Sequence, residues 1–107
     1  MEFPCPCCGF LVFREPPGSE AICPVCAWQD DVSQLRFPGI GGGTNLLSLF
    51  EAQKEFHKHD SFGTVGSFQK ESGWRPLDEN TDGEIILDLG EGEISYPEDM
   101  TKLYYWR

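Results

Sequence analysis

The sequence lacks long apolar runs. No part of its 107 residues approaches the roughly 18 consecutive apolar residues of a membrane-spanning helix. Its first residues, Met1 to Cys5, also lack the basic and apolar regions of a secretory signal peptide. These two absences predict a cytoplasmic protein without a membrane partner.

Basic residues are also few. Eight Lys and Arg stand against 18 Asp and Glu, which gives a formal net charge of −10. The phosphates of nucleic acid and the anionic surface of a membrane repel such a chain, so neither is expected as a partner. The same charge attracts a protein with a basic surface.

Recognisable catalytic motifs are absent as well. The sequence contains no motif that pairs a nucleophile with a base. The three glycines at 41–43 lack the Lys and the strand context of a phosphate-binding loop. We therefore expect that the protein is not an enzyme.

What the sequence does contain is five cysteines, at positions 5, 7, 8, 23 and 26. Four of them form two C-x2-C pairs separated by 14 residues, the spacing of a zinc site built from two knuckles. Each pair encloses a proline that pre-sets a turn dihedral, and Gly9 permits the positive φ that often closes a knuckle. The second knuckle has Ala27 at that position. We predict a structural Zn²⁺ bound by Cys5, Cys8, Cys23 and Cys26.

The short length of the chain is a second reason to expect a bound metal. The 107 residues fit one domain, 1–107, and a domain of this size buries only about two-thirds of the surface of its unfolded chain. Four thiolates leave no coordination position for a catalytic water. The metal is therefore expected to stabilise the fold, by on the order of 10 kcal/mol. Residues 1–63 carry the metal site, and residues 64–107 are acidic and aromatic.

Other uses of the cysteines stay open. Two disulfides would use the same four residues, but a reducing compartment disfavours them. Iron in a rubredoxin-like site is the stronger rival, although the 14-residue loop between the pairs is short for it. Cys7 is left over as a buried filler, a competing ligand or a reactive thiol. His57 and His59 are expected at a helix end rather than on the metal.

The predicted fold class is α+β. It combines a small zinc-ribbon or rubredoxin-knuckle hairpin, one amphipathic helix and a C-terminal antiparallel hairpin or small sheet. A strand over 10–14 is expected to turn at 16–19 and to return through Ala21–Ile22, as a hairpin between the cysteine pairs. The glycine-rich segment 38–43 is predicted to be a loop.

The helix is predicted over Leu49–Lys58. Ser48 and Glu51 have the spacing of a capping box at its start. Further along the chain, two strands over 84–89 and 93–96 are predicted to form the C-terminal hairpin.

Acidic residues gather in the C-terminal part. Between residues 71 and 99, ten acidic side chains accompany one Arg, so this segment has a net charge of −9. Such a segment is either a solvated face or an electrostatic docking surface. Aromatic side chains among the charges are typical of interface anchors, but the core of a chain this small needs such side chains equally. The candidate partner-binding residues are Trp74, Asp78, Glu79, Asp82, Glu84, Asp88, Glu91 and Glu93.

Several short motifs together carry a family resemblance. They are C-P-C-C-G at 5–9, I-C-P-V-C-x-W-x-D-D at 22–31, and G-G-T-N at 42–45 with S-L at 48–49 and E-A-Q at 51–53. In combination they resemble the bacterial cysteine-rich CPCC family over residues 3–63.

The resemblance implies a small cytoplasmic protein of the kind encoded beside polymorphic toxin genes, where a small protein commonly serves as the immunity factor. The expected function is therefore an immunity protein that neutralises a toxin by binding it. The alternatives are a zinc-ribbon adapter in a cellular complex and a rubredoxin-like iron electron carrier.

Overall fold

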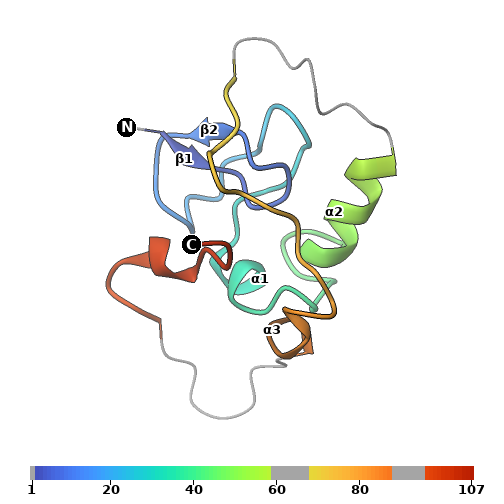
Figure 1. The fold of residues 1–107 in the computed structure, drawn as a ribbon. Helices are drawn as coiled ribbons and strands as arrows, with labels where there is room; N and C mark the ends of the chain where they lie inside the picture. The colour runs from blue at the N-terminus through green and yellow to red at the C-terminus, as the bar shows by residue number, and fades with distance from the viewer. Residues whose placement is uncertain (1, 59–67, 88–95) are drawn as a thin grey trace.

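The computed structural model describes residues 2–58, 68–87 and 96–107, except the side chains of 57, 58 and 87. Within these residues the chain forms a small α+β structure (Figure 1). Its elements in chain order are β1 (Phe3–Pro4), β2 (Leu11–Phe13), α1 (Val32–Arg36), α2 (Leu49–Lys58), α3 (Gly83–Leu87) and the 3-10 helix η1 (Met100–Leu103).

The two strands form an antiparallel hairpin around the first cysteine pair. Phe3 is paired with Phe13 and Pro4 with Leu11, and the register shifts between the two pairs. The predicted strand over 10–14 is confirmed as β2, but its predicted partner is wrong. β2 pairs with β1 because the chain turns back tightly over the first knuckle.

The segment that was expected to pair with β2 lies against the second knuckle instead. Ile22 forms a bridge with Gln29, and the Asp30 N–H donates to the Ala21 carbonyl at 2.8 Å. Each cysteine pair is therefore enclosed by its own local hairpin.

The helix α2 has the predicted bounds, and its capping box is present. The Ser48 hydroxyl accepts a hydrogen bond from the Glu51 N–H, and the Glu51 carboxylate accepts one from the Ser48 N–H, both at 3.1 Å. These reciprocal bonds satisfy two donors that a helix start leaves without partners. Leu49 is fully buried, so the helix packs its apolar face on the core.

The predicted C-terminal strand over 84–89 is wrong over 84–87, where the chain forms α3, and residues 88 and 89 lie outside the described residues. The Ile86 N–H donates to the Asp82 carbonyl at 3.0 Å in a helical turn. The carbonyl of Ile86 lies where a Cβ on Gly39 would be 1.7 Å away, so only glycine permits this contact. Packing against the 38–43 loop thus outweighs the strand propensity of two β-branched residues.

The second predicted strand, 93–96, falls mostly outside the described residues. Over 68–87 and 96–107, the parts of the C-terminal region that the structure describes, there is no sheet. The predicted C-terminal hairpin is therefore replaced by α3 and η1 in these parts. The 38–43 segment is a loop, as predicted.

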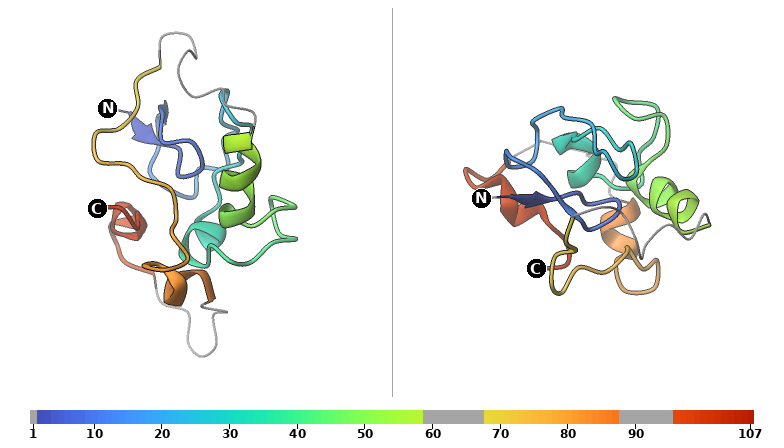
Figure 2. Two further views of the ribbon diagram at one scale, coloured as in Figure 1. Left: turned by 45° about the vertical axis from the view of Figure 1, so that its right-hand side comes forward. Right: turned by 90° about the horizontal axis from the view of Figure 1, so that it is seen from above.

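The core joins the two parts of the chain around the cysteines. Trp28 and Leu49 from the N-terminal part and Leu77 and Tyr104 from the C-terminal part belong to one buried cluster. In both views of Figure 2, α2 (green) and η1 (red) lie apart, with the N-terminal hairpin (blue) between them. Among the described residues, no helix has the length and apolar character needed to cross a bilayer.

Candidate metal centre

The two cysteine pairs are built on the same backbone pattern. The Cys5 N–H donates to the Phe10 carbonyl at 2.9 Å, and the Cys23 N–H donates to the Trp28 carbonyl at 2.8 Å. In each knuckle, a backbone hydrogen bond joins the first cysteine to the aromatic residue five positions later. The signal in the sequence is the repeat C-P-x-C-x-aromatic at 5–10 and 23–28, which includes the aromatic position in addition to the cysteine spacing.

A second hydrogen bond closes each knuckle at its sharpest turn. The Gly9 N–H donates to the Cys5 carbonyl at 2.7 Å, and the Ala27 N–H donates to the Cys23 carbonyl at 2.9 Å. Gly9 has a φ of 82° and Ala27 a φ of 67°. The positive φ predicted for Gly9 is confirmed, and Ala27 adopts the same left-handed conformation despite its side chain.

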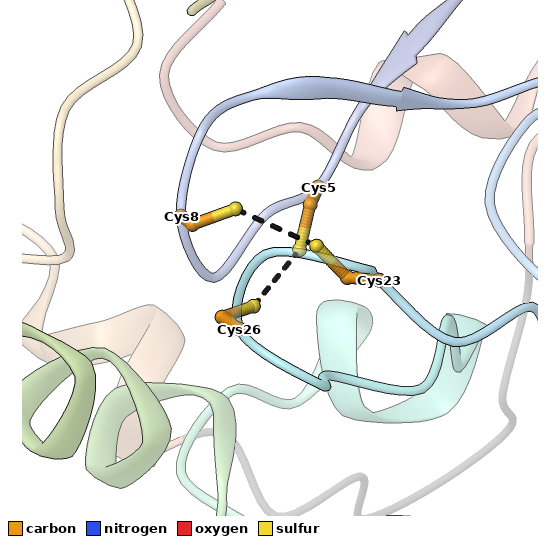
Figure 3. A group of neighbouring side chains, drawn as sticks. All are labelled: Cys5, Cys8, Cys23 and Cys26. Carbon is orange, nitrogen blue, oxygen red and sulfur yellow. Dashed lines mark hydrogen bonds between the residues drawn. The ribbon is translucent and has the colours of Figure 1, made fainter. Parts of the chain in front are cut away.

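The knuckles bring four sulfurs together around one point (Figure 3). All four Sγ atoms lie within 4.8 Å of one another. The Sγ atoms of Cys5 and Cys26 are 3.6 Å apart, and those of Cys8 and Cys23 are 3.7 Å apart. In a tetrahedral site with Zn–S bonds of about 2.3 Å, neighbouring sulfurs are about 3.8 Å apart. The sulfurs therefore fit the ligand shell of a single tetrahedral metal ion.

The same distances separate this arrangement from a pair of disulfides. A disulfide bond is about 2.05 Å long, and all five cysteines of the chain are free thiols. Three of the four clustered cysteines are fully buried, whereas Cys26 is partly exposed. Solvent therefore reaches the cluster mainly at Cys26.

The pKa values of the clustered cysteines are shifted because the four sulfurs are buried close together. Burial raises the pKa of the Cys5 thiol well above its ordinary value, and the hydrogen bond with Cys23 raises that of Cys8. Hydrogen bonds from its neighbours, Cys26 first, lower the pKa of Cys23. Four bare thiolates at this buried point are therefore unfavourable. A bound metal ion supplies the compensating positive charge, and its binding displaces the thiol protons.

The fifth cysteine stands outside this group of four. Cys7 is 2 % exposed and belongs to the buried core. Its position in the first knuckle is that of Val25 in the second, an apolar residue. The Val25 N–H donates to the Cys23 Sγ at 3.3 Å, the kind of bond that supports a metal-bound thiolate.

The first knuckle is held in place by a buried glutamine that the sequence analysis does not single out as a site residue. Gln53 in α2 donates from Nε2 to the Pro6 carbonyl and to the Tyr105 hydroxyl, both at 2.9 Å. Its Oε1 accepts from the Leu77 N–H at 2.8 Å. A polar residue one turn after the buried Leu49, on the apolar face of the helix, is the signal that identifies it.

The second knuckle is held by an asparagine from the glycine-rich loop. The Asn45 side chain accepts from the Gln29 N–H and donates to the Gln29 carbonyl, both at 2.9 Å. The buried Gln34 accepts from the Asn45 N–H at 2.9 Å. The motif that ends in Asn45 thus fixes the loop to the metal centre.

The structure places the candidate partner-binding residues in different environments. Trp74 packs on Gly9, where a Cβ would lie 2.5 Å from its ring, and donates to the Pro6 carbonyl at 3.2 Å. Asp82 is 6 % exposed and forms two bonds with Arg75, at 2.6 and 3.0 Å. These two side chains are engaged within the chain.

The other candidates divide into two groups. Asp78, Glu79 and Glu84 are exposed, and their partner binding stays a prediction. Asp88, Glu91 and Glu93 lie outside the described residues, as do His59 and the side chain of His57.

Comparison with known families gives one match. A family described as Cysteine-rich CPCC matches residues 3–80. The match includes both knuckles, and it extends the resemblance predicted over 3–63 to the segment that contains Trp74 and Leu77. A comparison with curated proteins gives no match.

Proposed function

This chain belongs to the cysteine-rich CPCC family, and we propose that it is a zinc protein that acts by binding another protein, as the immunity partner of a bacterial toxin. The observation that carries the metal-binding part of the proposal is the set of four cysteine sulfurs around one point. Four protein ligands complete a tetrahedral zinc site and leave no position for substrate or water. The metal then has a structural role, and function lies on the surface that the metal holds in shape.

Zinc is proposed rather than iron. A tetrahedral set of four sulfurs suits either metal, and the short loop between the pairs favours zinc over a rubredoxin-like iron site. Elemental analysis of the purified protein is expected to give one zinc per chain and a colourless solution. A red protein with visible charge-transfer bands and stoichiometric iron would make electron transfer the better proposal.

The charge of the chain supports a basic protein as partner. Four thiolates with one Zn²⁺ contribute −2, so the metal-loaded chain carries a net charge of about −12. Exposed acidic side chains occur on the C-terminal part at Asp78, Glu79 and Glu84. A field of this sign accelerates the capture of a cationic protein such as a toxin whose own target is a phosphate backbone.

The direct test uses the protein encoded beside this gene. We expect the zinc-loaded chain to co-purify with that protein and to restore growth when the two are co-expressed. The toxin–immunity role, which rests on the family resemblance, is excluded if the neighbouring product neither binds nor inhibits growth.

Salt and charge reversal test the electrostatic part separately. Raising the ionic strength from about 0.05 to 0.5 M should slow association with the toxin by at least about tenfold. Glu79→Lys with Glu84→Lys should slow it further than Glu2→Lys with Glu15→Lys, which changes the net charge equally at another place. Equal rates for the two double variants would show that the local acidic surface does not steer binding.

A further inference from the structure

A groove lies beside the metal centre, between the second knuckle and α2. We call it the knuckle groove, and the apolar residues that define it are Ala27, Trp28, Leu46, Leu47, Ala52 and Phe56. It has a volume of about 320 Å³, and Cys26 forms part of its wall. Such a volume accommodates one large side chain of another protein.

The groove is bordered by leucines that the fold leaves in solvent. Leu46 is 84 % exposed and Leu47 is 37 % exposed. A single exposed leucine needs no explanation, but adjacent leucines beside an apolar depression are typical of an interaction site.

The backbone that carries these leucines is fixed. The Gly42 N–H donates to the Leu46 carbonyl at 2.8 Å, and the buried Gln34 donates to the Leu47 carbonyl at 3.2 Å. Because the loop is ordered before any partner arrives, binding costs little conformational entropy.

The charge around the groove indicates the kind of occupant. Among the described residues that line it, Glu55 is the one charged side chain, and the exposed Glu51 lies one turn earlier on the same helix. A second metal-loaded copy of the chain would bring its own net charge of about −12 to this place, and the resulting repulsion is unfavourable. A cationic segment complements both the local acids and the net charge.

We propose that the knuckle groove binds an apolar side chain that is flanked by Lys or Arg on the basic partner. This inference rests on the proposed function, since it assigns the surface through which the protein binding takes place. It adds a docking site that is distinct from the C-terminal acidic residues. Since Ala27 and Cys26 belong to the second knuckle, the groove keeps its shape only while the knuckle does.

The test compares two exposed apolar residues in the zinc-loaded full chain. Leu46→Ser removes an edge of the groove, whereas Ile85→Ser removes a leucine-sized side chain that is 37 % exposed on α3, outside the groove. Calorimetry with the toxin encoded beside this gene should show at least about tenfold weaker binding for Leu46→Ser and less than about twofold for Ile85→Ser. Zinc content should match the wild type in both variants. Thermal unfolding should match it in Leu46→Ser, whose side chain is 84 % exposed, whereas Ile85→Ser should unfold at a lower temperature because its side chain is largely covered.

The outcomes separate this inference from the proposed function. If the wild type binds the toxin and Leu46→Ser binds equally well, the groove is not the docking site, while the proposed function stands. If the wild type does not bind the toxin, the toxin–immunity role fails. The groove is then judged with the peptides Lys-Lys-Trp-Lys-Lys and Glu-Glu-Trp-Glu-Glu. The groove is supported if the cationic peptide shifts the NMR signals of Leu46, Leu47 and Phe56 and the anionic peptide does not. It is overturned if the cationic peptide causes no shifts or if both peptides cause equal shifts.

Discussion

At the scale of single residues, Gly9 and Ala27 occupy equivalent turns of the two knuckles and show how the same backbone tolerates different side chains. Both have a positive φ and both donate to the carbonyl of a metal-binding cysteine. For a residue with a Cβ, the left-handed conformation costs about 1–2 kcal/mol. The surrounding contacts of the metal centre hold this turn in place, so Ala27 keeps the strained left-handed conformation.

The two positions should therefore respond in opposite ways to exchange of glycine and alanine. Ala27→Gly should raise the free energy of unfolding by about 0.5–1 kcal/mol. Gly9→Ala should lower it by more than about 2 kcal/mol, because its Cβ would lie 2.5 Å from the Trp74 ring. Denaturant unfolding of the zinc-loaded variants measures both values. A loss of stability in Ala27→Gly would contradict the equivalence of the knuckles.

At the scale of elements, α3 is a short helix that tertiary contacts hold in place. Its first turn follows Asp82, whose carboxylate pairs with Arg75 and accepts the Asp78 N–H at 2.9 Å. Its later part packs against the backbone of Gly39. A helix of five residues has little stability of its own, so these contacts decide the local structure.

The Arg75–Asp82 pair gives a pH-dependent prediction for this element. Hydrogen bonding to Arg75 lowers the pKa of Asp82 below its ordinary value of 3.8. A depressed pKa stabilises the folded state above the ordinary value, and this stability is lost as the pH falls through the folded-state pKa. Asp82→Asn should thus reduce stability at pH 7 by about 1–2 kcal/mol.

The difference between wild type and Asp82→Asn should be the same at pH 7 and pH 5, since the carboxylate stays ionised in the folded state over this range. Denaturant unfolding at the two pH values measures it, with the exposed Asp78→Asn as the control. A difference that shrinks toward pH 5 would show that Arg75 does not hold the pKa down.

At the scale of the whole molecule, the metal centre lies where both parts of the chain meet. The cysteines belong to the same buried cluster as Leu77 and Tyr104. The side chain of Gln53 in α2 is hydrogen-bonded to Pro6 in the first knuckle. It is also hydrogen-bonded to Leu77 and Tyr105 in the C-terminal part. Loss of the metal is therefore expected to affect the entire fold.

Removing zinc with a chelator should unfold the chain at neutral pH, because metal binding supplies on the order of 10 kcal/mol of folding free energy. Circular dichroism during chelation and zinc re-addition measures the loss and the return of structure. Cys5→Ser and Cys23→Ser should prevent folding. Cys7→Val, which copies Val25 of the second knuckle, should fold with one zinc per chain. Folding that is unaffected in Cys5→Ser would exclude a structural metal.

The parts of the fold that were predicted correctly depend on residues close together in the sequence. A knuckle is complete within six residues, so the cysteine spacing identifies the metal ligands without knowledge of the rest. The capping box at Ser48 and Glu51 likewise lies within a single helical turn and fixes the start of α2. Local hydrogen bonds and fixed dihedrals carry this information.

Other features depend on contacts between distant residues, and only the tertiary structure decided them. The β-branched residues of α3 favour a strand, but the approach of Ile86 to Gly39 selects a helix. Trp74 and Asp82 are candidate partner-binding residues in the sequence, and contacts with Pro6 and Arg75 engage them within the chain. Such contacts exist only after the chain has folded, and a pattern in neighbouring residues does not encode them.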